Sequence, residues 1–131
     1  MKRILIIDDD ESAIDLLRQI LEQAGYEVVA AKNGQEGLKL FRQQKFDLVV
    51  TDMVMPVKDG LKTILSLRQE DPTIPLIAIS GGGAIAKERY LNVAGYIEGV
   101  STFPKPYSRT ELLAGVNKLL MAPPVDPPPT D

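Results

Sequence analysis

The stretch RILIIDDD, residues 3–10, joins a short apolar strand directly to a run of three aspartates. Its apolar residues follow one another without polar alternation, which is typical of a strand buried on both faces of a parallel sheet. Ligands of such sheets bind beyond the carboxyl ends of the strands, which is where these aspartates stand. The stretch therefore predicts both a fold class and the position of a polar site.

Further apolar runs continue the pattern along the chain. They are YEVVAA at 26–31, DLVVT at 47–51, PLIAIS at 75–80 and a weaker VSTF at 100–103. Longer segments of helical period separate or follow them, around residues 13–24, 33–41, 61–68, 84–97 and 108–120. This alternation predicts an α/β fold, a doubly wound five-stranded parallel sheet with five helices.

Local signals place several helix ends. Gly25 is expected to stop the first helix, Asn33 to open the second, and Ser108 with Glu111 forms a capping box before the last. The first helix carries an apolar stripe at i, i+3, i+4 spacing, which is expected to face the core. The stripe consists of Ala13, Leu16, Leu17, Ile20, Leu21 and Ala24.

The composition excludes several kinds of chemistry. The chain has no cysteine and no histidine, so disulfides, thiol catalysis, Ser–His–Asp triads and His-ligated metals are ruled out. The net charge of −3 argues against nucleic-acid binding by this domain, because such binding needs a basic surface. Carboxylate, hydroxyl and lysine groups remain for any reaction.

The domain organisation is simple. A chain of 131 residues suits one domain, expected over residues 1–121, and APPVDPPPTD at 122–131 is expected to be a proline-rich linker or disordered tail. We expect the natural protein to continue beyond it. No apolar run suits a signal peptide or a membrane span, so a cytoplasmic location without membrane contact is expected.

Polar residues stand at the carboxyl ends of four of the predicted strands. Asp8, Asp9 and Asp10 follow the first, Asp52 follows the third, Ser80 with three glycines ends the fourth, and Lys105–Pro106 follows the fifth. Clustered carboxylates repel one another unless a cation intervenes, and a few carboxylates with water suit Mg²⁺. A phosphoryl group on Asp52 could then be neutralised by Mg²⁺ and Lys105 and accept a hydrogen bond from Ser80.

These residues carry a resemblance to a known family. Asp8–Asp9, the segment DMVMPVKDG at 52–60, Ser80 followed by a glycine, and Lys105–Pro106 resemble the response-regulator receiver domain of two-component signalling. The resemblance covers roughly Lys2 to Met121, in the family's order and spacing. It implies a flavodoxin-like (βα)5 fold, like that of the chemotaxis receivers.

The resemblance also implies a role for each matching residue. Asp52 would be the phosphoacceptor, assisted by Lys105 and Ser80. Mg²⁺ would be bound by Asp9, Asp52 and the Val54 carbonyl, with Asp8 acting mainly through water. The phosphodonor would be a histidine of a sensor kinase or phosphotransfer protein, and an output domain or protein could follow. The only catalysis would be self-directed phosphoryl transfer and autodephosphorylation, in a monomer or weak dimer.

One position departs from the family pattern. Receivers commonly place Tyr or Phe three residues before the lysine, whereas this chain has Thr102 there and Phe103 beside it. Because threonine is too small to fill the space of a ring, we expect phosphorylation to change the face formed by the fourth helix, fifth strand and fifth helix only modestly. The family also implies a cis peptide bond between Lys105 and Pro106.

Two other functions fit parts of the sequence. IIDDDES also matches the D-x-D-x-[ST] motif of haloacid-dehalogenase-type phosphatases, with Asp8 as nucleophile and Asp10 as general acid and base. That reading leaves Asp52 without a task, and the chain has no room for a cap domain. A nucleotide-binding loop at SGGG, residues 80–83, ranks last because it lacks the spacing of known phosphate-binding motifs. Asp10 and Glu11 are also typical of the first turn of a helix.

Overall fold

The computed structural model describes residues 1–52, 60–80, 100–104 and 107–121. Several predictions fall outside these ranges and are not tested by the structure. They concern Val54, the glycines at 81–83, the helix expected at 84–97, Lys105, the Lys105–Pro106 bond and the tail at 122–131.

Five strands and four helices lie within the described residues, close to the segments that the sequence predicts. The strands are β1 (Arg3–Ile7), β2 (Glu27–Ala31), β3 (Leu48–Asp52), β4 (Leu76–Ser80) and β5 (Val100–Pro104). The helices are α1 (Glu11–Gln23), α2 (Gly34–Gln43), α3 (Gly60–Glu70) and α5 (Arg109–Met121). The strands pair in parallel in the order β2-β1-β3-β4-β5, so the predicted parallel α/β sheet is confirmed.

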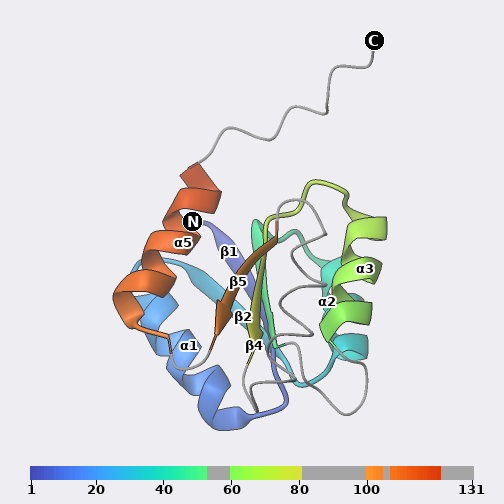
Figure 1. Ribbon diagram of the computed structural model, residues 1–131. Helices are drawn as coiled ribbons and strands as arrows, with labels where there is room; N and C mark the ends of the chain where they lie inside the picture. Colours follow the sequence, from blue (N-terminus) through green and yellow to red (C-terminus); the bar gives the residue numbers. More distant parts are fainter. Residues whose placement is uncertain (53–59, 81–99, 105–106, 122–131) are drawn as a thin grey trace.

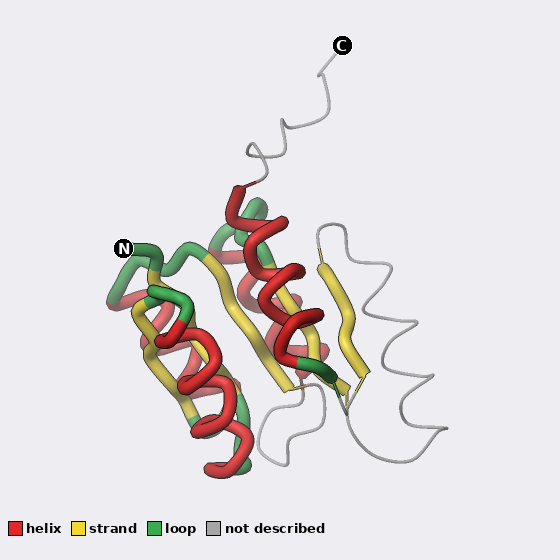
Figure 2. Tube along the Cα trace, turned by 90° about the vertical axis from the view of Figure 1, so that its left-hand side faces the viewer, coloured by secondary structure: helices red, strands yellow, loops and turns green. Residues whose placement is uncertain are grey.

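The helices cover both faces of the sheet. In Figure 1, α1 and α5 lie on one side of the strands, and α2 and α3 lie on the other. Figure 2 views the molecule from the side that α1 and α5 cover, with both helices lying across the strands. Alternate strand residues point to opposite faces, so each helix pair buries its own set of strand side chains.

The core accordingly has two halves. One half lies under α2 and α3 and includes Leu5, Ile7, Val49, Ile64 and Leu67. The other half lies under α1 and α5 and includes Ile4, Ile6, Leu17, Val50, Ile79, Leu112 and Val116. Ile4 to Ile7 of β1 are all completely buried, as the continuous apolar run predicts.

The predicted helix ends are confirmed, with one correction to the packing of α1. The Asn33 side chain accepts a hydrogen bond from the Glu36 amide at 2.8 Å, and Gly25 has the positive φ of +97° that favours glycine at a helix stop. The buried stripe on α1 differs from the predicted one. Leu17, Ile20 and Leu21 are buried as predicted, and Ile14, which the prediction omitted, is buried with them. Leu16 is 52% exposed and Ala24 is also exposed, so the prediction was wrong for these two residues. Leu16 lies at the outer edge of the stripe, where the helix turns its side chain towards solvent.

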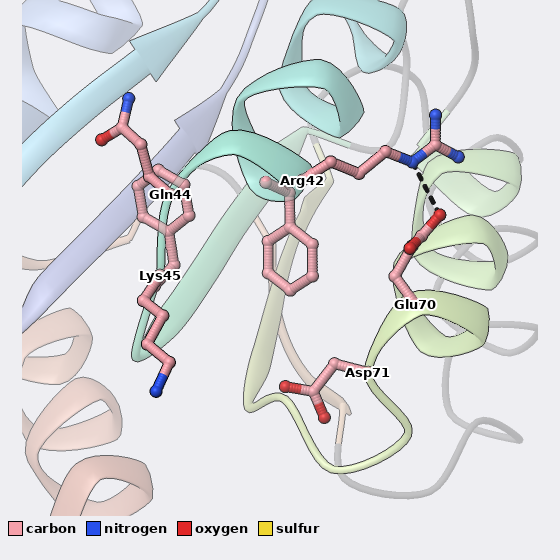
Figure 3. Close-up of a pocket in the computed structure, with 7 residues that line it drawn as sticks. Arg42, Gln44, Lys45, Glu70 and Asp71 are labelled. Carbon is pink, nitrogen blue, oxygen red and sulfur yellow. Dashed lines mark hydrogen bonds and ion pairs between the residues drawn. The ribbon is translucent and has the colours of Figure 1, made fainter.

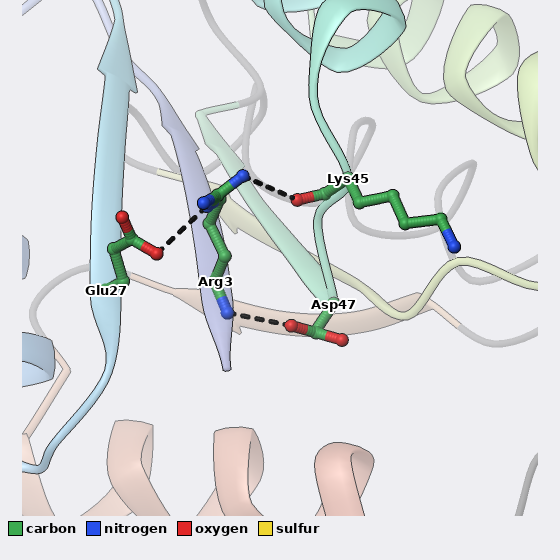
Figure 4. Close-up of polar contacts among 4 residues, drawn as sticks. All are labelled: Arg3, Glu27, Lys45 and Asp47. Carbon is green, nitrogen blue, oxygen red and sulfur yellow. Dashed lines mark hydrogen bonds and ion pairs between the residues drawn. The ribbon is translucent and has the colours of Figure 1, made fainter. Parts of the chain in front are cut away.

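Arg3, at the start of β1, forms hydrogen bonds with residues at the starts of β2 and β3, at the edge of the sheet opposite the predicted site. Figure 4 shows its guanidinium reaching Glu27 on β2 at 3.0 Å and the carbonyl of Lys45, while its backbone amide donates to Asp47 just before β3. These contacts help hold the register of β1 between β2 and β3, and that register sets the relative positions of the residues at the other edge.

Candidate metal and phosphoryl-transfer site

The topology brings the first two groups of predicted site residues together. The chain leaves β1 towards β2 on one side and returns to β3 on the other, so the crossover direction changes between β1 and β3. In parallel α/β sheets this switch point opens a crevice at the carboxyl ends of the strands. Ile7 is paired with Thr51, so Asp8 and Asp52, the next residues along, stand on either side of that crevice.

Three carboxylates gather at this point. Asp8, Asp9 and Asp52 each have a carboxylate oxygen within 4.8 Å of the others. Asp8 is 2% exposed and Asp52 is 8% exposed, whereas Asp9 is open to solvent. Buried carboxylates so close together favour a cation between them, and an all-oxygen donor set with one open side fits a hard divalent ion such as Mg²⁺. The residues present therefore fit the predicted metal.

Backbone contacts hold the first acidic residues in place. The Asp8 amide extends the β1–β2 pairing by donating to the Ala31 carbonyl at 3.1 Å. Its carboxylate accepts a hydrogen bond from the Asp10 amide at 2.9 Å, which turns the chain sharply from strand to helix. Asp8 is thus oriented by the backbone on both sides.

Asp10 has a different task from its neighbours. Its carboxylate accepts a hydrogen bond from the Ser12 amide at 3.0 Å and caps the N-terminus of α1. It does not belong to the group of three carboxylates. The prediction that Asp10 belongs to the helix start is confirmed, and its carboxylate is engaged in capping.

The strand register brings Ser80 and the end of β5 to the same edge. Asp52 is paired with Ile79, and Ser80, the last residue of β4, is paired with Pro104, the last residue of β5. Ser80 and the chain leading into Lys105 therefore arrive one step beyond the row that contains Asp52. The roles predicted for the Ser80 hydroxyl, for Lys105 and for the Val54 carbonyl remain predictions.

Tyr107 is a residue near the site that the sequence interpretation did not single out. It is half-buried and packs against the core under α1 and α5. Burial raises the pKa of the Tyr107 phenol above its usual value, and the negative charge of Asp8 raises it further. The sequence signal that could have pointed to Tyr107 is its position, two residues after Lys105 and just before the last helix.

A hollow elsewhere on the molecule does not belong to this site. It has a volume of about 600 Å³ and lies between the C-terminal ends of α2 and α3, at the amino-terminal edge of the sheet. Figure 3 shows Arg42 and Glu70 bridging its rim through an ion pair of 2.7 Å, with Gln44, Lys45 and Asp71 around it. The carboxylate cluster stands at the opposite edge.

The fold, the order of the strands and the carboxylates at the switch point together define a receiver-type signalling domain. The model of the response regulator receiver domain family matches residues 4–117. The chain belongs to this family.

Individual relatives agree with that assignment. The chain is 35% identical over 120 residues to the alkaline phosphatase synthesis transcriptional regulatory protein PhoP of Bacillus subtilis, and the match covers 91% of this chain and 48% of PhoP. It is 34% identical over 121 residues to the transcriptional regulatory protein CpxR of Escherichia coli, covering 92% of this chain and 50% of CpxR. The chain thus spans about half the length of the curated relatives that it matches.

A solved structure is similar over nearly the whole domain. The response regulator protein TrrA of Thermotoga maritima, crystallised in complex with Mg²⁺ and beryllofluoride, matches with a TM-score of 0.81 and 31% identity. The match covers 92% of this chain and 100% of that one. Among the described residues, no helix is both long and apolar enough to cross a membrane.

Proposed function

We propose that this chain is the phosphoacceptor of a two-component phosphorelay, accepting a phosphoryl group on Asp52 in a Mg²⁺-dependent reaction. The observation that carries the proposal is the group of carboxylates from Asp8, Asp9 and Asp52 at the switch point of the sheet, two of them buried. Membership of the receiver family and the similarity to a structure holding Mg²⁺ and beryllofluoride support it.

Each residue has a defined part in the proposed reaction. Asp9 and Asp52 would bind Mg²⁺ directly, and Asp8 would act mainly through water. The receiver family implies the Val54 carbonyl as a third protein ligand. When bound, the metal neutralises negative charge on the phosphoryl oxygens. Lys105 neutralises that charge from the other side, and the Ser80 hydroxyl donates a hydrogen bond to a phosphoryl oxygen.

The chemical step is a direct displacement at phosphorus. A carboxylate oxygen of Asp52 attacks the phosphorus of a phosphohistidine on the donor protein, so an O–P bond forms and the N–P bond breaks. The electron pair of the broken bond stays on the imidazole nitrogen, which takes up a proton. The donor that the receiver family implies is a sensor histidine kinase or histidine phosphotransfer protein, and this chain has no histidine of its own.

The wider role is that of a switch acting in the cytoplasm. The chain catalyses only transfer to itself and the loss of its own phosphoryl group. The phosphorylated chain then acts on an output domain or partner protein. The relatives that it half covers are transcriptional regulators, which makes a DNA-binding output domain one natural partner. The receiver itself, with its net charge of −3, does not bind nucleic acid.

The phosphatase alternative loses support from the geometry. It needs Asp10 as a general acid and base, whereas the Asp10 carboxylate caps α1 and lies outside the carboxylate group. It also leaves the buried Asp52 without a role.

Phosphotransfer to paired variants tests the proposed function. The chain and its Asp52→Asn and Asp10→Asn variants are incubated with a small-molecule phosphodonor, acetyl phosphate, and Mg²⁺. Asp52→Asn is expected to lose labelling, because an amide oxygen is a poor nucleophile. Asp10→Asn should retain labelling, because asparagine still caps the helix. Labelling of Asp52→Asn at full stoichiometry would rule out the proposal.

A further inference from the structure

A buried threonine stands immediately before Asp52, at the end of an otherwise apolar part of β3. Thr51 is 0% exposed and follows Leu48, Val49 and Val50. Its partners in the sheet, Ile7 on β1 and Ala78 on β4, belong to the core half under α2 and α3, so the Thr51 side chain faces the same half. A hydroxyl among such neighbours costs free energy unless it is hydrogen-bonded, and valine would have nearly the same shape without that cost.

The Thr51 hydroxyl is used on the next residue of the chain. It donates a hydrogen bond to the main-chain carbonyl of Asp52, with Oγ1 and O 3.1 Å apart. The Val49 amide points to β4, since it donates to the Pro75 carbonyl. Backbone groups of successive strand residues alternate in direction, so the Asp52 carbonyl of a regular strand would point to β1. The pairing of β3 with β1 ends at Thr51, and the hydroxyl therefore supplies a donor where that pairing stops.

This hydrogen bond restricts the backbone of Asp52. It closes a ring that runs from the Thr51 side chain through the Asp52 N, Cα, C and O atoms. Rotation about either main-chain bond of the Asp52 Cα atom would break the ring, so the direction of its Cα–Cβ bond is held relative to β3. That direction decides where the carboxylate lies, and one of its oxygens is within 4.8 Å of carboxylate oxygens of Asp8 and Asp9.

The two side chains lie on opposite faces of the sheet. Asp52 is paired with Ile79, which belongs to the core half under α1 and α5, whereas Thr51 faces the half under α2 and α3. The Thr51 hydroxyl can therefore influence the carboxylate through the Asp52 backbone without lying among the clustered carboxylates.

We propose that Thr51 is a positioning residue for phosphoryl transfer, and that its hydroxyl holds the Asp52 carboxylate in the orientation from which it attacks phosphorus. The inference rests on the proposed function, because it takes Asp52 as the nucleophile. A carboxylate held in one orientation reaches phosphorus more often in the geometry of attack than one that turns with its backbone. Removal of the hydroxyl should therefore slow the transfer itself.

The test compares the full chain with three variants. Thr51→Val keeps the shape of the side chain and removes the donor, and Thr51→Ser keeps the donor and removes the methyl group. Thr63→Val is the matched control, because Thr63 is a second threonine with 0% exposure and lies on α3, outside the sheet. Initial rates of phosphorylation are measured over a range of acetyl phosphate concentrations at saturating Mg²⁺, which separates the maximal rate from KM. Denaturant unfolding gives the stability of each protein.

Thr51→Val is expected to lower the maximal rate by about tenfold and to change KM by less than about threefold, because the nucleophile is misplaced while the donor site is unchanged. Thr51→Ser and Thr63→Val should keep the maximal rate within about threefold of the unmodified chain. Thr51→Ser should nevertheless be less stable than the unmodified chain, because it loses a buried methyl group. A role in stability alone would instead make the rate follow the stability of each variant.

The remaining outcomes separate the two proposals. If Thr51→Val keeps its maximal rate, if Thr51→Ser is as slow as Thr51→Val, or if Thr63→Val slows to the same extent, the positioning role is wrong while the proposed function stands. Should Thr51→Val not fold, Thr51→Ala replaces it, since alanine also lacks the hydroxyl. If the unmodified chain is not phosphorylated on Asp52, both proposals fail.

Discussion

The three clustered aspartates differ in their surroundings, and these differences suggest how a metal enters the site. Asp8 and Asp52 are buried, and the Asp8 carboxylate already accepts a backbone hydrogen bond. Asp9 is exposed, so its carboxylate faces water at the open side of the cluster. We infer that Asp9 provides the carboxylate that an incoming hydrated Mg²⁺ meets first, while the buried pair sets the charge that attracts it.

This arrangement predicts different effects for two neighbouring acids. Asp9→Asn should weaken Mg²⁺ binding by about tenfold or more, because it removes a direct ligand. Asp10→Asn removes the same charge one residue further on, retains the helix cap, and should change Mg²⁺ affinity much less. Isothermal titration with MgCl2 measures both. Equal affinities for the two variants would place the metal elsewhere.

The half-buried phenol of Tyr107 predicts a dependence of stability on pH. Its raised pKa means that the folded state holds the phenolic proton more tightly than the unfolded state does. The free energy of unfolding should therefore be unaffected by this group below the usual tyrosine pKa of about 10, and should fall as pH rises beyond it. In Tyr107→Phe this part of the fall should disappear.

Urea denaturation at a series of pH values measures this effect. The other three tyrosines of the chain are common to both proteins and cancel in the comparison. Because the Asp8 charge is the second cause of the shift, Asp8→Asn should bring the Tyr107 pKa closer to its usual value. Identical pH profiles for the unmodified chain and Tyr107→Phe would show that the phenol is not held in its neutral form.

At the scale of single elements, two helices use glycine to approach a strand residue that leads into the site. Gly115 of α5 lies under Phe103, and Gly37 of α2 lies against Ile7, the residue before Asp8. A Cβ on Gly37 would stand 2.8 Å from Cγ1 of Ile7 and closer still to its Cδ1. Both faces of the sheet are thus packed tightly just before the residues that carry the chemistry.

Gly37→Ala should therefore destabilise the fold although alanine favours helix. The crowding is expected to cost about 1–3 kcal/mol. Alanine gains about 1 kcal/mol in helix propensity over glycine, so the crowding outweighs this gain when its cost lies towards about 3 kcal/mol. Adding Ile7→Val, which removes the crowding Cδ1 atom, should restore part of the loss. Lys39→Ala, at an exposed position of the same helix, is the control. Denaturant unfolding measures all four proteins, and a more stable Gly37→Ala would contradict the packing described.

These elements show why the sequence predicted some features and not others. Strands β1, β3 and β4 were predictable because their apolar runs are continuous and each is bounded by polar or turn residues. Asp8, Asp9 and Asp52 were predictable because parallel strands bring their carboxyl ends to one edge. Neither glycine contact has a sequence signal, because Ile7 and Gly37 are 30 residues apart and nothing in their spacing specifies contact. Leu16 was misplaced because helical spacing alone does not define the edge of a buried stripe.

At the scale of the whole molecule, the carboxylate cluster links metal binding to folding. The cluster combines residues from β3 and from the turn after β1, so it is assembled only in the folded chain. A ligand that binds the folded state alone stabilises it by about 2.7 kcal/mol when present at 100 times its Kd. Mg²⁺ should therefore raise the melting temperature by several degrees, and Asp9→Asn should show a smaller rise at the same concentration. NaCl at equal ionic strength is the control, and an equal rise with NaCl would indicate simple screening.

The central claim is that Asp52 is the residue that accepts the phosphoryl group, and locating that group tests it most directly. The chain is treated with acetyl phosphate and Mg²⁺, the aspartyl phosphate is reduced with borohydride, and the modified residue is identified by mass spectrometry of its peptides. The account predicts modification at Asp52, at the end of β3 beside the buried Asp8. Modification at Asp8, with Asp52 unchanged, would contradict it and would favour the phosphatase chemistry instead.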